Sequence, residues 1–508
     1  MLKYVQYLLI TVLLLYSNHM LSQRQAYSTY NGGGLFGLDY NPPNAAVILK
    51  FNDDTLEQII EPVNMHLSVF YSRAAYSDTN GNLLFASNGW RLVNREGEVL
   101  SYKLWDQSMP HPGNSADSTA ILVMNGPLFL DDPANPDRAF LLYGQHKSLV
   151  FPNFSGTYDM TFSYAYLDVP NKALISQNNT IPIDTSALGD MVATRHANGR
   201  DWWIIKPGLL HNKYYIGLLD PTGFNFEEIT IPGLTPSRQA NTTSQFSFDG
   251  SRYVHFTQAP LRQIHVYDFD RCSGTLSNLI VHDISDSLVQ GDINPISLSP
   301  DGTKIYLKRA NSNIPPLNAG LFQFDLNIGQ FTYFIAQHAT YATLAPNGKT
   351  MVFSSDIINQ NGVPLERFVS EIMHPNLSGE ACNAQIHKYP VSNKLAMVMP
   401  SNYANFKLGA LEGSGCDTLS LITRLVSKTV KIKAFPNPFH ETLMIETDGL
   451  LPAQLTVRNM LGQVVLEEQL NLVQTQLNDH WADLPAGMYS LEVKNRQQNT
   501  SIIKVLKE

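Results

Sequence analysis

The stretch TRHANGRDWW (194–203) holds the densest group of polar side chains that could carry chemistry. It places Arg195, His196, Arg200 and Asp201 directly before a pair of tryptophans. Such a cluster could supply a general base or hold a ligand. The alternative is that Arg, His and Asp tie one structural unit to the next through buried hydrogen bonds, while the indoles fill the space between the units. We favour this structural interpretation.

Other stretches resemble catalytic or metal-binding motifs but lack essential members. APNGKT (345–350) ends like a phosphate-binding loop, yet Thr343 stands where that loop requires its first glycine. DTNGN (78–82) alternates Asp78, Asn80 and Asn82 as a calcium loop does, but the glycine and glutamate that an EF-hand needs further along are absent. The sequence contains no G-x-S-x-G and no H-E-x-x-H. We therefore expect no catalytic residue, cofactor or metal ion.

Three cysteines, Cys272, Cys382 and Cys416, show no metal-binding spacing. In an oxidising compartment Cys382 and Cys416 could form a disulfide, which would leave Cys272 unpaired. Three buried free thiols are the competing interpretation, and the sequence favours neither.

Short β-rich runs separated by tight turns make up residues 25–425. Asp-Gly or Asn-Gly precedes several of them, as in FSFDGSRYVHF (246–256) and LSPDGTKIYL (298–307), and supplies the positive φ of a two-residue hairpin. The turn glycines Gly199, Gly250, Gly302 and Gly348 lie 51, 52 and 46 residues apart. A repeat of this length predicts the blades of a β-propeller.

Six blade-like units can be recognised. The run NAAVILKFN (44–52) is expected to complete a seventh blade with residues near 395–425, so we favour seven blades over six. A stacked β-solenoid or a pair of β-sandwiches is the alternative architecture.

The N-terminus and the overall charge indicate where the protein resides. Lys3 precedes an apolar run, from Tyr4 to Tyr16, that is typical of a secretory signal peptide, and we expect cleavage near Ser22. An uncleaved anchor helix is the alternative, although the run is short for a membrane span. No other segment could cross a membrane. The net charge of −9, without a dense basic run, argues against a nucleic-acid partner.

Residues 435–508 form a second predicted unit, a small Ig-like β-sandwich after a linker at 426–434. It opens with FPNPFHETLMIE (435–446), in which two prolines around Asn437 cannot join a ladder, so this segment is expected to mark the domain boundary. AQLTVRNMLGQVVLEEQ (453–469) contains two strand-like runs around Leu461-Gly462-Gln463. In LPAGMYSLEV (484–493) a turn leads to a strand with Tyr489, Leu491 and Val493 on one face, and TSIIKVLKE (500–508) supplies the last strand. An ordinary C-terminal binding module is the competing interpretation.

Both parts of the chain resemble known families. SDTNGNLLFASNGWRLVNREGEVL (77–100), RHANGRDWWIIKP (195–207), YDFDRCSGTLSN (267–278) and NFKLGALEGSGCDTL (405–419) resemble secreted WD40-like propellers of Gram-negative bacteria that use type IX secretion. The ordered motifs of the tail resemble the type A C-terminal sorting domain of that system. The sorting residues that this resemblance implies are Pro436, Asn437, Pro438, Phe439, Gly462, Gly487, Tyr489 and Lys504.

The resemblance implies export through the periplasm, recognition of the tail by the outer-membrane translocon and its sorting machinery, and a secreted or cell-surface protein. We expect a non-catalytic propeller that binds a protein or glycan through its loops. The alternative is a propeller hydrolase, such as a lactonase or a glycan-cleaving enzyme, with a metal or carboxylate site in the central channel. A scaffold for a surface assembly is a third possibility.

Overall fold

The protein forms two compact units in this computed structural model, one built from most of residues 1–418 and one that contains residues 419–508. The structure describes residues 35–36, 45–51, 56–64, 74–78, 82–104, 126–151, 154–184, 186–187, 190–237, 239, 242–257, 261–284, 293–309, 320–337, 339–358, 364–391, 405–416, 432–447, 453–460, 463–470, 474–477, 484–494 and 500–508. The predicted signal peptide, residues 1–22, lies outside these ranges.

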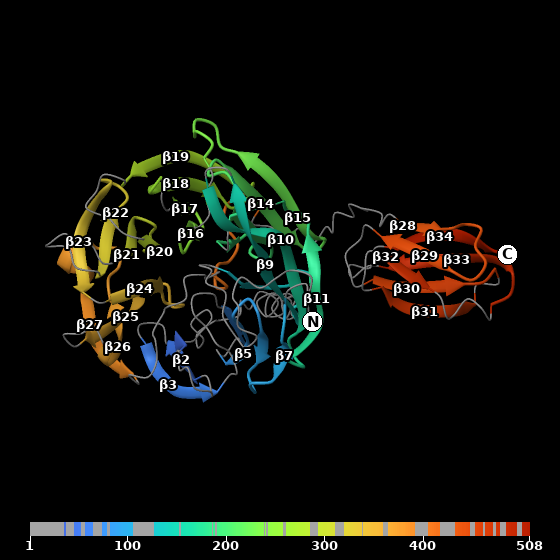
Figure 1. Ribbon diagram of the computed structural model, residues 1–508, viewed down its shortest axis with the longest axis horizontal. Coiled ribbons are helices and arrows are strands. Elements are labelled where there is room, and N and C mark those ends of the chain that lie inside the picture. The colour runs from blue at the N-terminus through green and yellow to red at the C-terminus, as the bar shows by residue number, and fades with distance from the viewer. Residues whose placement is uncertain are drawn as a thin grey trace, which may run out of the picture. The chain divides into compact units, whose positions relative to one another are not determined.

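The described part of the first unit contains seven antiparallel sheets, which follow one another around a ring (Figure 1). The first sheet has three strands and the other six have four each. The strands are β1 (Leu35–Phe36), β2 (Ala45–Phe51), β3 (Leu56–Asn64), β4 (Ala74–Ser77), β5 (Leu83–Ser87), β6 (Leu92–Asn94), β7 (Val99–Ser101), β8 (Leu128–Asp131), β9 (Arg138–Phe151), β10 (Phe154–Asp168), β11 (Ala173–Ile181), β12 (Val192–Arg195), β13 (Trp202–Pro207), β14 (Lys213–Asp220), β15 (Gly223–Thr230), β16 (Thr242–Phe246), β17 (Arg252–Thr257), β18 (Gln263–Asp270), β19 (Thr275–Asp283), β20 (Ile293–Leu298), β21 (Lys304–Arg309), β22 (Gly320–Asp325), β23 (Gln330–Gln337), β24 (Ala339–Leu344), β25 (Met351–Ile358), β26 (Pro364–Ile372) and β27 (Ala384–Val391). This arrangement confirms the predicted all-β propeller. The helical structure in the described residues is one 3-10 turn, η1 (Gly379–Cys382).

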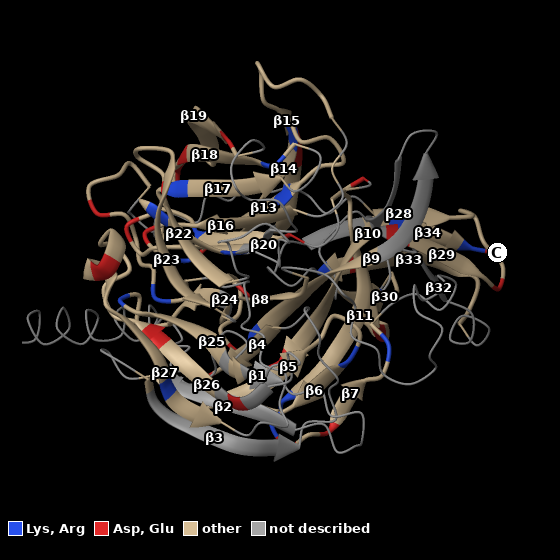
Figure 2. Cartoon of the chain, turned by 60° about the vertical axis from the view of Figure 1, so that its left-hand side comes forward, with Lys and Arg blue, Asp and Glu red and all other residues tan. Residues whose placement is uncertain are grey.

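Within a four-stranded blade, consecutive strands pair, so that the first strand lies nearest the axis and the last forms the outer edge (Figure 1). Burial follows this order. Every residue of β16 is buried, whereas β19 in the same blade is mostly exposed or half-buried. In Figure 2 the charged residues are dispersed over many loops and strands of the propeller, which agrees with the absence of a basic run in the sequence.

The repeated Asp-Gly and Asn-Gly turns connect adjacent antiparallel strands, as predicted, but they are longer than a two-residue hairpin. They join the first strand of a blade to the second. Residues 247–251 separate β16 from β17, and residues 345–350 separate β24 from β25. The Asp249 carboxylate accepts hydrogen bonds from the Ser251 N–H (3.0 Å) and the Ser247 hydroxyl (2.6 Å), while Gly250 adopts a φ of 72°. The acidic side chain therefore organises a wider turn than the hairpin rule requires.

The core of the propeller lies between neighbouring blades. Val254 of β17 and Val266 of β18, for example, belong to one buried cluster with Ile305 and Leu307 of β21 in the next blade. A twisted sheet cannot cover both of its own faces, so each blade depends on its neighbours for burial. Full burial of one such side chain contributes about 1.5–3 kcal/mol.

The ring closes between the β24–β27 sheet and the β1–β3 sheet. Residues 44–52 do supply a strand, β2, but its described partners are β1 and β3, and among the described residues near 395–425 none joins this sheet. Most residues near 395–425 lie outside the described ranges, so the predicted strand exchange stays a prediction. The described link between the two sheets is the buried Glu371 carboxylate of β26, which accepts a hydrogen bond from the Leu56 N–H of β3 (3.0 Å). The same carboxylate forms an ion pair with Lys388 (2.5 Å) and accepts a hydrogen bond from the Tyr389 hydroxyl (3.2 Å).

The second unit is a small β-sandwich of two sheets, ordered β28-β29-β32 and β31-β30-β33-β34. Its core includes Leu455 and Val457 and, as predicted, the face of Tyr489, Leu491 and Val493. The strands are β28 (Ile432–Phe435), β29 (Leu443–Thr447), β30 (Ala453–Arg458), β31 (Val464–Leu470), β32 (Gln474–Leu477), β33 (Gly487–Lys494) and β34 (Thr500–Lys507).

The Pro-Asn-Pro segment lies inside this sandwich and does not mark its edge. Strand β28 begins at Ile432, within the predicted linker, and pairs with β29, so that the prolines fall between two strands of one sheet. A sequence rule that keeps prolines out of ladders locates an interruption, but it cannot say whether the interruption separates two domains or two strands of the same domain.

Replacement of Glu371 by alanine should lower the free energy of unfolding by about 3 kcal/mol, because it leaves the Lys388 ammonium and the Leu56 N–H without their shared acceptor. Glu371→Gln keeps the acceptor oxygen and should cost less. Chemical denaturation of the full chain measures both. As a control, Glu96→Ala removes the exposed Lys172–Glu96 pair and should cost under about 1 kcal/mol. Equal effects of E371A and E96A would contradict the role of Glu371 in ring closure.

Candidate functional site

The residues of the predicted polar cluster lie at the turn that joins β12 to β13. Asn198 organises this turn, because its Oδ1 accepts hydrogen bonds from the N–H groups of Arg200 (2.9 Å) and Asp201 (3.0 Å). The Asp201 carboxylate in turn accepts a hydrogen bond from Asn198 Nδ2 (2.7 Å) and forms an ion pair with Arg200 Nε (2.7 Å). The side chains of Arg200 and Asp201 thus hold their own turn.

Arg195 points away from this turn towards the preceding blade. Its buried guanidinium forms an ion pair with Asp131 of β8 (2.8 Å) and lies over the ring of Trp202, 3.7 Å from the ring centroid. Burial lowers the pKa of Arg195, and the charge of Asp131 opposes that shift. Asp131 also accepts a hydrogen bond from the Tyr76 hydroxyl of β4 (2.5 Å), so one carboxylate joins three successive blades.

His196 and Trp203 point towards the following blade. The Nδ1 of His196 accepts a hydrogen bond from the Asn198 N–H (3.0 Å), which leaves Nε2 to donate to the Cys272 carbonyl (3.0 Å). Trp203 Nε1 donates to the Arg271 carbonyl (2.7 Å) in the same β18–β19 turn. The structure therefore brings the predicted cluster together, and its contacts run between blades, which favours the structural interpretation over a ligand site.

A segment that sequence analysis quoted for its family resemblance, but to which it assigned no role at this site, crosses this face of the propeller. We define residues 405–416 as the strap. Arg271 Nη2 donates to the Gly409 carbonyl (2.5 Å), and the Leu411 N–H donates to the Ala197 carbonyl (2.8 Å). A Cβ on Gly199 would lie 2.5 Å from the Ala410 nitrogen, so that turn requires glycine to let the strap approach.

Phe406 places the start of the strap at the centre of the ring. Its ring centroid lies 5.9 Å from that of Tyr76 and 5.1 Å from that of Trp202, both in edge-on geometry. Those two residues belong to blades that are not neighbours. A side chain that contacts both must lie near the axis, where the inner strands converge (Figure 1).

The far end of the strap is fixed by a disulfide between Cys272 and Cys416, whose Cα atoms are 5.7 Å apart. The predicted Cys382–Cys416 pairing is therefore wrong. Cys382 is a buried free thiol in η1, above the β24–β27 blade, and burial raises its pKa. Sequence separation could not decide the pairing, because only the path of the strap brings Cys416 to the β18–β19 turn.

A cavity of about 580 Å³ opens between the turns of two adjacent blades. Its lining comes from the β20–β21 turn, the β24–β25 turn and the loop that follows β26. Leu377 in that loop is 49% exposed. The lining residues are Pro300, Gly348, Lys349, Thr350, Met373, His374, Pro375, Asn376 and Leu377. The motif APNGKT thus forms a hairpin turn at the cavity, where apolar side chains are mixed with an amide, an imidazole and an ammonium group.

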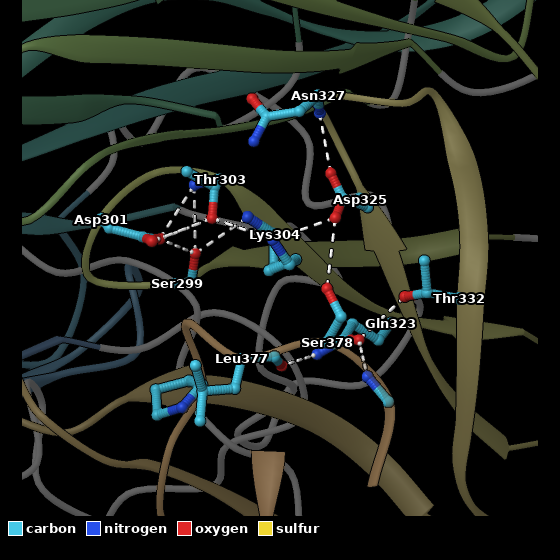
Figure 3. A network of polar contacts seen from close by, with 12 residues as sticks. Ser299, Asp301, Thr303, Lys304, Gln323, Asp325, Asn327, Thr332, Leu377 and Ser378 are labelled. Carbon is cyan, nitrogen blue, oxygen red and sulfur yellow. Dashed lines mark hydrogen bonds and ion pairs between the residues drawn. The ribbon is translucent and has the colours of Figure 1, made fainter. Parts of the chain in front are cut away.

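The loop that follows β26 is held against the β20–β23 blade by the network in Figure 3. Gln323 Nε2 donates to the Leu377 carbonyl (2.8 Å), and Gln323 Oε1 accepts a hydrogen bond from the Gly379 N–H (2.9 Å). Asp325 accepts a hydrogen bond from the Ser378 hydroxyl (3.3 Å) and pairs with the buried Lys304 ammonium (3.0 Å). These contacts hold one wall of the cavity against the β20–β23 blade.

A layer of buried histidines and tyrosines lies between β13–β14 and β16–β18. The Tyr214 hydroxyl lies 2.6 Å from His255 Nδ1, and the rings of His255 and His265 are 5.7 Å apart. Burial raises the pKa of Tyr214 well above its usual value, so the phenol remains a donor. Burial also lowers the pKa of His255, and it lowers that of His265 to about 4, with the charge of His211 adding to both shifts.

The calcium-like DTNGN motif forms a turn in which Asp78 Oδ1 accepts a hydrogen bond from the Asn82 N–H (2.7 Å). Asn80 lies outside the described residues. Across the described ranges, no group of three His, Cys, Asp or Glu side chains is placed to hold a metal ion. Nor is any helix in those ranges long and apolar enough to cross a membrane.

The predicted sorting residues surround the last strand of the sandwich. Pro436 and Pro438 follow cis peptide bonds, and Asn437 between them replaces the missing ladder contacts. Its Oδ1 accepts a hydrogen bond from the Leu506 N–H (2.9 Å), and its Nδ2 donates to the Lys504 carbonyl (3.1 Å). Phe439 is buried in the core.

At the start of β33, which begins at Gly487, the Tyr489 hydroxyl donates to the Pro485 carbonyl (2.7 Å). Lys504 is exposed, whereas the second lysine of β34, Lys507, is buried and donates from Nζ to the Leu484 carbonyl (2.6 Å). Gly462 lies outside the described residues.

Comparison with known proteins gives a family for the tail. Residues 433–508 match the secretion system C-terminal sorting domain, which confirms the predicted type IX sorting domain. The chain is thus a β-propeller exported by that system and is secreted or displayed at the cell surface. No curated protein matches the chain.

Solved structures that match this chain have low sequence identity to it and low TM-scores. PorZ, a surface component of the type IX secretion system of Porphyromonas gingivalis, is 9% identical over 92% of this chain and 80% of its own, with a TM-score of 0.26. A putative 6-phosphogluconolactonase from Bacteroides fragilis is 12% identical over 73% and 96%, with a TM-score of 0.38. The periplasmic gluconolactonase of Pseudomonas aeruginosa is 11% identical over 72% and 98%, with a TM-score of 0.28. At these scores the similarities carry no conclusion about activity.

Loss of the disulfide should free the far end of the strap. Cys416→Ser is expected to lower the free energy of unfolding of the propeller by about 3 kcal/mol, because the bridge closes a long loop across 144 residues. Thermal melts and limited proteolysis measure the change. A reductant should destabilise the wild type but not C416S. If the reductant lowers the melting temperature of both proteins equally, the strap does not depend on this bond.

Acid should weaken the propeller through His255 and His265. Both are neutral when folded, and their pKa values lie below the ordinary 6.5 that they regain on unfolding. The contribution of these two histidines to the free energy of unfolding is therefore fully present above pH 6.5. It is lost as the pH drops towards 4, and the loss for His265 is about 3 kcal/mol. Thermal melts across this range should show a smaller slope for His265→Asn. An unchanged slope in H265N would contradict the assignment.

Proposed function

We propose that this protein is a surface-displayed or released β-propeller that binds a protein or glycan without converting it chemically. The face that carries the first-to-second-strand turns is the proposed binding face. The sorting domain supports export, since it directs proteins out of the cell. The expected signal peptide at 1–22 would provide the first step and remains a prediction.

The observation that carries this proposal is the cavity beside Leu377. It has the volume of a ligand site, and it combines apolar surface at Met373, Pro375 and Leu377 with polar groups at His374 and Asn376. Sugars and peptide side chains both present apolar faces bordered by hydrogen-bonding groups, so a mixed lining suits either. An exposed leucine at the rim is a candidate anchor for such a ligand.

The rigidity of the cavity wall supports binding as well. Ligand binding is weakened by the entropy of ordering loops, and a wall already held by Gln323 and Asp325 avoids that cost. The neighbouring turn also contributes, because the Asp301 N–H donates to Asn376 Oδ1 (3.2 Å) and joins the two sides of the cavity.

A glycan array and a pull-down from cell-surface extracts, both with the secreted protein, test the proposal. Leu377→Ser should weaken capture of the ligand about tenfold, the change expected when about 1.4 kcal/mol of binding free energy is lost. Ile280→Ser, which removes a similarly exposed side chain from the outer strand β19, is the matched control and should bind normally.

Two outcomes would contradict the proposal. If L377S and I280S weaken ligand capture equally, the ligand does not bind specifically at the cavity. Release of a cleaved product from a captured glycan would instead support the alternative of a propeller hydrolase.

A further inference from the structure

The outer face of the sorting domain carries a row of side chains whose order is fixed by strand register. Val464 of β31 pairs with Arg458 of β30, Arg458 pairs with Ser490 of β33, and Ser490 pairs with Lys504 of β34. In the adjacent row of the same face, Met488 pairs with Leu506. Alternation places these side chains opposite the core, since Tyr489 and Val505 between them are buried.

Apolar side chains on this face are exposed well beyond what the sandwich needs for its own packing. Val464 is 45% exposed, Met488 is 42% exposed and Leu506 is 39% exposed. Met460, in the turn after β30, is 67% exposed. We define Val464, Met488 and Leu506 with the flanking cations Arg458 and Lys504 as the sorting patch. Apolar groups gathered at one end of a small sheet mark an interaction surface.

The charges of the sorting patch indicate the character of its partner. Lys504 is exposed and forms no ion pair with any described residue of the chain, and Arg458 pairs with Glu492 (3.6 Å). A partner with carboxylates beside an apolar surface would complement both features. Methionine side chains also adapt to the shape of the surface that they meet.

We propose that the sorting patch is the surface by which a receptor protein of the secretion machinery binds this domain. The occupant follows from the family of residues 433–508, since a sorting domain acts by being recognised. Asn437 and Phe439 have a supporting role, because both bond to the Leu506 backbone and hold its side chain on the outer face. The Pro-Asn-Pro-Phe motif thus bonds along the backbone of β34 and holds this edge strand of the patch in place.

The test is export of the full chain from a host with the type IX system. Met488→Glu with Leu506→Glu should lower the ratio of secreted to periplasmic protein about tenfold. The matched control is Gln454→Glu with Gln469→Glu, which adds the same charge to an exposed cross-strand pair on the same sheet, away from the patch. That variant should be exported normally.

A thermal melt of each periplasmic protein distinguishes lost recognition from lost folding. Lys504→Glu provides a second variant that leaves the apolar pair intact.

Normal export of both patch variants would overturn the proposal, and so would equal loss in the Gln454/Gln469 control. Self-association of the wild type that the Met488/Leu506 variant abolishes without loss of export would assign the patch to a second copy of the chain instead. Ligand capture by the propeller should be the same in all of these proteins, so the outcome is independent of the proposed binding function.

Discussion

Buried polar bridges between blades are the interactions on which the rest of the propeller depends. In the described residues the ring has no strand shared between its first and last sheets, so closure rests on side chains such as Glu371, which joins β26 to β3. Asp131 of β8 likewise joins neighbouring blades, because it bonds to Tyr76 of β4 and to Arg195 of β12. Such bridges are worth keeping only when every partner is satisfied, because a lone buried charge is strongly destabilising. They join neighbouring blades through specific side chains.

The strap adds a second constraint, across the ring instead of around it. Phe406 fills the space near the axis, and the disulfide from Cys416 anchors the other end on an outer turn. A disulfide of this kind persists in an oxidising environment, which agrees with a chain that carries a secretion sorting domain. The Arg195–Asp201 turn contacts the strap directly. The Ala197 carbonyl accepts a hydrogen bond from the strap, and Gly199 leaves room for the strap backbone.

In both units an exposed apolar side chain lies beside backbone that side-chain hydrogen bonds hold in place. In the propeller, the network around Gln323 and Asp325 fixes a loop that exposes Leu377 beside a cavity. In the sandwich, Asn437 fixes a strand that exposes Leu506. In each case side-chain hydrogen bonds hold the backbone, and an apolar side chain beside them is exposed to water. The two surfaces belong to different units, so substitutions can test the proposed binding surface and the proposed sorting surface separately.

The sequence by itself determined the all-β class, the propeller and the sorting domain, because alternation, turn glycines and ordered tail motifs are local signals. It also placed Arg195, His196, Arg200 and Asp201 together, since they share one turn. The sequence did not predict contacts between segments that lie far apart along the chain. The Cys272–Cys416 pairing, the strap, the closure through Glu371 and the cavity each join residues that no local pattern relates. Only the ring brings them within bonding distance, and that is why tertiary structure alone decided them.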